Sequence, residues 1–187
     1  MSDALAIALV SGSLNPESVS RSMAQYAAKS LSALGAQVDF IDLRETKLPL
    51  CDGDAAYSDP QVMETRARIE NSAGILVAAP VYNFYMNAAV KNLVELTGSA
   101  WEGKPIGFLN AAGGYSSYMS VMSLANSLML DFRCVIVPRF VYATGSAFQD
   151  GAISNSKVGK RIDELATELV RFAKALTNHG SQPDARR

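Results

Sequence analysis

This chain of 187 residues has one histidine, two cysteines and almost equal numbers of positive and negative side chains. The single histidine, His179, lies in the polar C-terminal stretch, and Cys51 and Cys134 form no Cys-x-x-Cys pair. A metal centre is therefore not expected, because protein metal sites gather several such residues. Two lone thiols are typical of a reducing compartment. Lys plus Arg number 17 and Asp plus Glu number 18, and this balance disfavours nucleic acid and anionic membrane surfaces as partners.

Long hydrophobic runs are also missing. The first apolar run, Ala4–Val10, is too short to cross a membrane, and no basic segment of the kind that begins a signal peptide precedes it. We therefore expect a cytoplasmic protein. The length suits one domain with a full-sized core, which we place at residues 1–180, followed by a polar C-terminal tail at 181–187.

Short apolar segments alternate with amphipathic ones along the chain. Continuous apolar runs are typical of strands that are covered on both faces, and they predict strands at Ala4–Val10, Val38–Leu43, Gly74–Ala79, Pro105–Leu109 and Cys134–Val137, the last continuing as far as Tyr142. Apolar residues at helical spacing predict helices over residues 18–34, 61–71, 87–96, 118–130 and 157–176. Asp59-Pro60 looks like a helix start, and Gly35 is placed to end the first helix.

This alternation predicts an α/β fold, specifically a flavodoxin-like, doubly wound, five-stranded parallel sheet with helices on both faces. Sheets of this kind bind ligands beyond the carboxyl ends of their strands. The loops after the first, third and fourth strands are therefore where function is expected.

The loop after the first strand, Ser11–Arg21, is rich in hydroxyls and opens a helix. A helix N-terminus attracts phosphate, and Ser13, Ser18 and Ser20 could add hydroxyl donors while Arg21 could add charge. The loop is neither a dinucleotide Gly-x-Gly-x-x-Gly motif nor a P-loop. The structural alternative is that these residues simply form a turn and a helix cap.

The loop after the third strand, Pro80–Asn92, has three aromatic residues within four positions: Tyr82, Phe84 and Tyr85. Aromatic side chains and backbone amides at such a place suit a flat ligand, although they could equally cover the core or a subunit interface. After the fourth strand, Gly113 and Gly114 would let the backbone approach a flat ligand closely. The adjacent Tyr115 could flank that ligand or pack against protein.

Together these loops resemble those of the NAD(P)H-dependent FMN reductase family. The similar segments are Gly12–Ser22 (GSLNPESVSRS), Ala79–Asn83 (APVYN) with Val90–Asn92 (VKN), and Ala111–Gly114 (AAGG), and the resemblance covers about Leu5 to Tyr142. It implies that Ser13, Ser18 and Ser20 hold the FMN phosphate. The full FMN-binding set that it implies is Ser11, Ser13, Asn15, Ser18, Val19, Ser20, Pro80, Val81, Tyr82, Asn83, Phe84, Ala112, Gly113, Gly114 and Tyr115.

Two departures from the family pattern are visible. Asn15 stands where the family often has arginine, which removes one cationic contact to phosphate. The segment Phe84–Asn87 replaces the usual small residues and Pro-Gly, and so places bulk beside the expected flavin.

The activity that the resemblance implies is hydride transfer from NADPH or NADH to FMN, and then reduction of a small-molecule acceptor such as free flavin, a quinone, an azo compound or a metal oxyanion. No catalytic side chain is expected, because the cofactor carries this chemistry. The alternatives are a non-catalytic FMN electron carrier and a flavin-free α/β interaction domain. An apolar rim made of Phe84, Tyr85, Trp101, Tyr115 and Tyr118 further predicts a homodimer or homotetramer.

Overall fold

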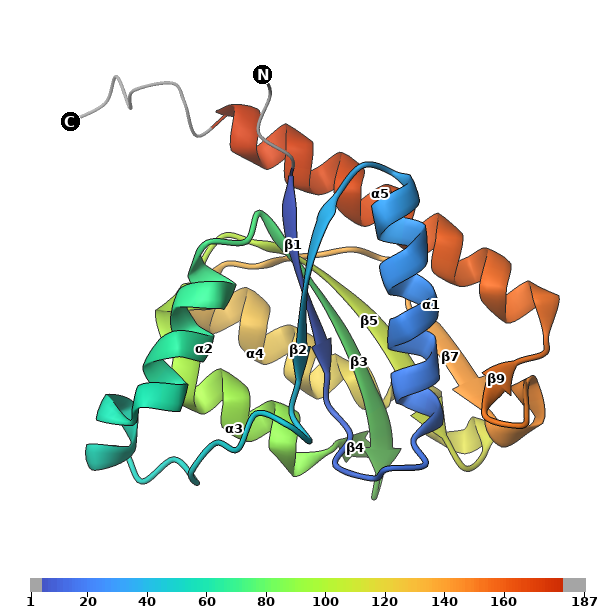
Figure 1. Cartoon of the computed structure of the whole chain (residues 1–187), viewed down its shortest axis with the longest axis horizontal. Helices are drawn as coiled ribbons and strands as arrows, with labels where there is room; N and C mark the ends of the chain where they lie inside the picture. The colour runs from blue at the N-terminus through green and yellow to red at the C-terminus, as the bar shows by residue number, and fades with distance from the viewer. Residues whose placement is uncertain (1–4, 180–187) are drawn as a thin grey trace.

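The computed structural model describes residues 5–179 and has a mostly parallel sheet at its centre (Figure 1). The strand order is β2-β1-β3-β5-β6, so the expected flavodoxin-like topology is confirmed. The parallel strands of this path are β1 (Ala6–Ser11), β2 (Gln37–Asp42), β3 (Gly74–Tyr82), β5 (Pro105–Ala112) and β6 (Val135–Ile136). The tail expected at 181–187 lies outside the described residues.

The last strand of the sheet is divided, contrary to the expectation of one strand running from Cys134 toward Tyr142. Strand β6 ends at Ile136, and β7 (Val141–Thr144) resumes the parallel pairing farther along β5. Pro138 lies in the gap, and a proline has no N–H to donate to the ladder. A second difference from the prediction is β4 (Tyr85–Met86), which folds back antiparallel on β3.

Helices cover both faces of the sheet, as predicted. Helices α1 (Val19–Ala33) and α5 (Ser156–His179) pack on one face, while α2 (Pro60–Glu70), α3 (Ala88–Thr97) and α4 (Met122–Phe132) pack on the other (Figure 1). Alternate residues of β1 enter the two cores, since Ile7 and Leu9 face α1 and α5 whereas Ala8 and Val10 face the other layer. This continuous burial explains why the strand sequence is apolar without interruption.

The helix ends follow local chemistry. Asp59 caps α2 by accepting hydrogen bonds from the Gln61 and Val62 amides at 2.8 and 3.3 Å, and Gly35 follows α1 with a positive φ of 81°. The helix expected at 118–130 is different, because α4 begins only at Met122. A 3₁₀ helix, η3 (Tyr115–Val121), precedes it.

Several short elements were not predicted. They are the 3₁₀ helices η1 (Ala55–Ser58), η2 (Gly98–Trp101) and η4 (Gly145–Ala147), and a two-stranded hairpin made of β8 (Phe148–Gln149) and β9 (Ala152–Ile153). No helix within residues 5–179 is both long and apolar enough to cross a membrane. Because β1, β3 and β5 are parallel, the three loops selected from the sequence all leave the same edge of the sheet.

Candidate functional site

A cavity of about 310 Å³ lies at this carboxyl edge. Its volume falls in the range of about 300–1,000 Å³ that is usual for small-molecule sites. The three predicted loops line it together, through Ser13, Asn15, Glu17, Ser18, Val19, Ser20, Pro80, Val81, Tyr82, Ala111, Ala112 and Gly113. Gly145, directly after β7, completes the lining and was not predicted.

The start of α1 forms one wall of the cavity. The Ser18 hydroxyl oxygen accepts a hydrogen bond from the Arg21 amide at 3.3 Å and lies 2.8 Å from the Ser20 hydroxyl. The preceding turn is fixed by the Asn15 side chain, which accepts from the Glu17 amide at 2.9 Å. The first amides of a helix have no partner within it, so this wall presents N–H groups together with hydroxyls. Such a wall suits a phosphate.

Charge in this wall differs from the expectation. Arg21 is not free to meet an anion, because its guanidinium lies 2.6 Å from the carboxylate of the buried Asp42. The residues that line the cavity include no lysine or arginine, and they include Glu17, which sequence reasoning missed. A phosphate would therefore be held here by the helix start and the hydroxyls rather than by a cation.

Close packing holds the loop after β1, the phosphate loop expected from the sequence, against α3. The Asn87 side-chain amide donates to the Gly12 carbonyl at 2.6 Å, and the Gly12 amide donates to the Ala78 carbonyl at 2.8 Å. A Cβ on Gly12 would lie only 2.3 Å from Cγ2 of Val90. Glycine is required at this position by contact with α3, and neither Gly12 nor Asn87 was predicted as part of the site.

The third-strand loop is a tight hairpin. Pro80, Val81 and Tyr82 belong to β3, and Tyr82 pairs with Tyr85 across a two-residue turn. Both turn residues, Asn83 and Phe84, have positive φ values of 50° and 64°, as in a type I′ turn. This turn carries the Phe84 side chain out to solvent, where it is 57% exposed.

The loop after β5, which is the fourth predicted strand, and Gly145 after β7 border the other side of the cavity. A Cβ on Gly113, Gly114 or Gly145 would have no atom of residues 5–179 within 4 Å, so space is open above this backbone. The Tyr142 hydroxyl, on β7, donates to the Gly114 carbonyl and so holds the loop after β5 in place. Hydrogen bonds with Thr144, and then with Ser146, lower the pKa of the exposed Tyr115.

Most of the predicted residues therefore meet in one cavity, and the others lie around it. Asn83, Phe84, Gly114 and Tyr115 are outside its lining. Ser11 is fully buried at the end of β1, and its hydroxyl has no hydrogen-bond partner among the described residues.

The apolar rim predicted around the site needs one correction. Trp101 is completely buried, and its indole N–H donates to the Thr97 hydroxyl at 2.7 Å, so it belongs to the core. Tyr85 is half-buried. Phe84, Tyr115 and Tyr118 are exposed, as expected.

Comparison with known proteins places this site in a family. The sequence model of the NADPH-dependent FMN reductases matches residues 5–149. A curated NADPH:quinone oxidoreductase of Arabidopsis thaliana is 29% identical over 174 residues, which cover 88% of this chain and 86% of that protein. A quinone reductase of Pseudomonas putida is 28% identical over 186 residues, covering 93% of this chain and 97% of that protein.

Among solved structures, the flavoenzyme NAD(P)H:(acceptor) oxidoreductase FerB of Paracoccus denitrificans superposes with a TM-score of 0.75 at 21% identity. The match covers 92% of this chain and 98% of that one, and it supports the fold. The chain belongs to the NADPH-dependent FMN reductase family. It is an FMN-dependent NAD(P)H oxidoreductase, and its cofactor is FMN.

The residues of the cavity fit FMN. The helix start with its serines suits the phosphate, and the bare backbone at Gly113 and Gly145 leaves room for a flat ring. The isoalloxazine supplies the hydride chemistry, so these residues need only bind it, orient it and leave one face accessible.

Proposed function

We propose that this enzyme reduces quinones with electrons from NADPH or NADH. The observation that carries the proposal is the activity of the two relatives that match nearly the whole chain, an NADPH:quinone oxidoreductase and a quinone reductase. The exposed aromatic side chains of Tyr82, which lines the cavity, and of Phe84 and Tyr115 in the adjoining loops suit a flat apolar acceptor.

Within this proposal each loop has one task. Val19 and Ser20 at the start of α1, with Ser13 and Ser18, bind the phosphate. The end of β3 supports the ring edge and the ribityl chain, and the backbone of Gly113 approaches the pyrimidine end. Because no side chain donates or accepts a proton in hydride transfer itself, no catalytic acid or base is assigned.

An acceptor panel tests the proposal. The FMN-loaded enzyme is supplied with NADPH, and turnover is measured with benzoquinone, an azo dye, free riboflavin and chromate as acceptors. The proposal expects kcat/KM for benzoquinone to exceed the others by at least about tenfold, the equivalent of 1.4 kcal/mol of transition-state stabilisation. A higher kcat/KM for any of the other three acceptors would contradict it.

We also propose that the chain forms a homodimer or a dimer of dimers. Large apolar side chains are exposed in the hairpin after β3, in η3 and in α4, and include Phe84, Tyr115, Tyr118, Met119 and Leu130. These segments are neighbours, because β4 contacts η3 and η3 contacts α4, and exposed apolar surface of this kind is typical of a partner surface. Light scattering at micromolar concentration tests the assembly, and a monomer would contradict it.

A cytoplasmic location is the accompanying proposal. Both cysteines are free thiols in the structure, as is usual in a reducing compartment. Recovery of the native protein in the periplasmic or membrane fraction of its own cells would contradict this location.

A further inference from the structure

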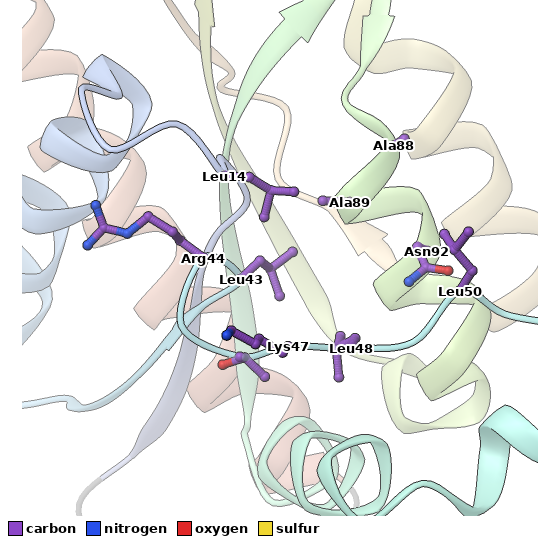
Figure 2. Close-up of a pocket in the computed structure, with 10 residues that line it drawn as sticks. Leu14, Leu43, Arg44, Lys47, Leu48, Leu50, Ala88, Ala89 and Asn92 are labelled. Atoms are coloured by element: carbon purple, nitrogen blue, oxygen red, sulfur yellow. The ribbon is translucent and has the colours of Figure 1, made fainter.

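A second cavity, a groove of about 440 Å³, shares a wall with the cofactor site (Figure 2). The shared wall is the loop after β1, because Ser13 and Asn15 line the cofactor cavity whereas Leu14 between them lines the groove. The other walls are the segment after β2, residues 43–50, and the start of α3 with Ala88, Ala89 and Asn92.

Hydrogen bonds from fixed side chains shape this groove. Asn92 on α3 clamps the segment after β2, since its oxygen accepts from the Cys51 amide at 2.9 Å and its amide donates to the Pro49 carbonyl at 2.8 Å. At the other end of the segment, the Asp42 side chain accepts from the Arg44 amide at 3.1 Å. The Asp42 carboxylate also pairs with Arg21 of α1, which ties the segment to the cofactor-binding helix. The groove is thus preformed.

The lining combines an apolar floor with one available cation. Leucines supply most of the floor, and two of them are unusually exposed, Leu14 at 57% and Leu50 at 83%. Of the two cations in the lining, Arg44 is paired with Glu45 at 2.8 Å. Lys47 is exposed and forms no ion pair or hydrogen bond with any of the residues 5–179.

We propose that this groove binds the adenosine end of NADPH, with the adenine against the leucines and the 2′-phosphate on Lys47. A nucleoside whose base is an aromatic heterocycle and whose ribose carries a phosphate monoester matches an apolar floor beside a single unpaired ammonium. The groove and the cofactor cavity lie on the two sides of one loop, since Leu14 lines the first and Ser13 and Asn15 line the second, so a dinucleotide would cross this loop to join them. The inference rests on the proposed function in that the bound NADPH must deliver its hydride to FMN there.

The proposal makes Lys47 a determinant of donor choice, because NADH differs from NADPH only by lacking the 2′-phosphate. Two measurements test this role of Lys47, and each is made on the wild type and on the variants Lys47→Ala and Lys47→Arg. The first is calorimetric binding of adenosine 2′,5′-bisphosphate and of adenosine 5′-monophosphate, which needs no catalysis. The second is the anaerobic rate of flavin reduction as a function of NADPH or NADH concentration. Since no acceptor is present in that mixture, any effect belongs to the donor. Lys29→Ala on the exposed side of α1 is the matched charge control.

In Lys47→Ala we expect the dissociation constants for the bisphosphate and for NADPH to rise about five- to tenfold, the size of one charge-assisted hydrogen bond at an exposed site. Values for the monophosphate and NADH should stay unchanged, as should the limiting rate of reduction. Lys47→Arg should retain most of the affinity, and Lys29→Ala should match the wild type.

Equal effects on both donors, or no effect on either, would overturn the assignment. So would dissociation of an oligomer in Lys47→Ala with donor affinities unchanged, because the groove would then be a subunit contact. Failure of the wild type to accept electrons from either donor would refute the proposed function, while bisphosphate binding would still decide the role of Lys47.

Discussion

Replacing Gly12 by alanine should damage both stability and cofactor binding through one contact. The added Cβ would lie 2.3 Å from Cγ2 of Val90, 3.2 Å from Cβ of Ala79 and 3.3 Å from the Ala78 carbonyl oxygen. Carbon atoms in favourable contact are about 3.5–4.0 Å apart, so the first contact cannot be accommodated without moving the loop or α3. Overpacking of this kind costs about 1–3 kcal/mol of unfolding free energy.

The partner of the clash offers an internal control. Val90→Ala removes the methyl groups that the new Cβ would meet, at its own cost of about 1.5–2 kcal/mol for the lost apolar contacts. The double variant Gly12→Ala/Val90→Ala should therefore be more stable than the sum of the two single changes predicts, by about 1–2 kcal/mol. FMN affinity should fall in Gly12→Ala and recover in the double variant, because Asn87 holds the Gly12 carbonyl in the phosphate loop.

Urea unfolding, followed by the fluorescence of the single tryptophan, Trp101, gives the stability cycle, and FMN titration gives the affinity cycle. Trp101 is fully buried, so its emission reports on the core. Additive free energies, within about 0.3–0.5 kcal/mol, would refute the contact between Gly12 and Val90 as the reason for glycine. An unchanged FMN affinity in Gly12→Ala would refute its link to the phosphate loop.

Three further predictions follow from the same structure. Glu17→Gln should tighten FMN binding about two- to fivefold by removing a negative charge beside the phosphate, and the gain should shrink in high salt; a titration showing weaker binding would contradict this. Gly113→Val should leave the unfolding free energy within about 0.5 kcal/mol of wild type, since its Cβ meets no described atom, yet weaken FMN binding about tenfold or more. Burial raises the pKa of the Cys134 thiol from 9.0 to about 11, so its protonated form stabilises the fold below pH 9 and this contribution is lost as the pH rises toward 11. Urea unfolding at about pH 8 and about pH 10.5 should therefore show a loss that is about 1–2 kcal/mol smaller in Cys134→Ala, and equal losses would argue against this role.

Most of the sheet and the edge at which the cavity lies could be predicted from the sequence. Strands covered on both faces must be continuously apolar, and β1, β3 and β5 are. Parallel strands must bring their following loops to one edge, and the cavity lies there. The helix cap at Asp59 could be predicted because it depends only on neighbouring residues, the amides of Gln61 and Val62.

The missed features depend on contacts between distant parts of the chain. Gly12 meets Val90, and Asn92 clamps Pro49 and Cys51, so no local pattern could assign these roles. Arg21 was considered as a source of positive charge for the phosphate, but its guanidinium forms an ion pair with Asp42 at the end of β2. Some local signals were present and overlooked.

Two of those signals concern the region after β5. Pro138 marks the break between β6 and β7, since it cannot donate to the ladder. Asp150-Gly151, with φ values of 51° and 75°, is a favoured two-residue hairpin turn and joins β8 to β9. Both could have been predicted from the residues alone.

Anaerobic mixing of the FMN-loaded protein with NADPH tests the central claim most directly, through the flavin absorbance at about 450 nm, a property of the cofactor. This account predicts rapid bleaching by NADPH and restoration of the absorbance when benzoquinone is added. Retention of FMN without bleaching by NADPH or NADH would contradict the reductase, and failure to retain FMN would contradict the cofactor site at the start of α1.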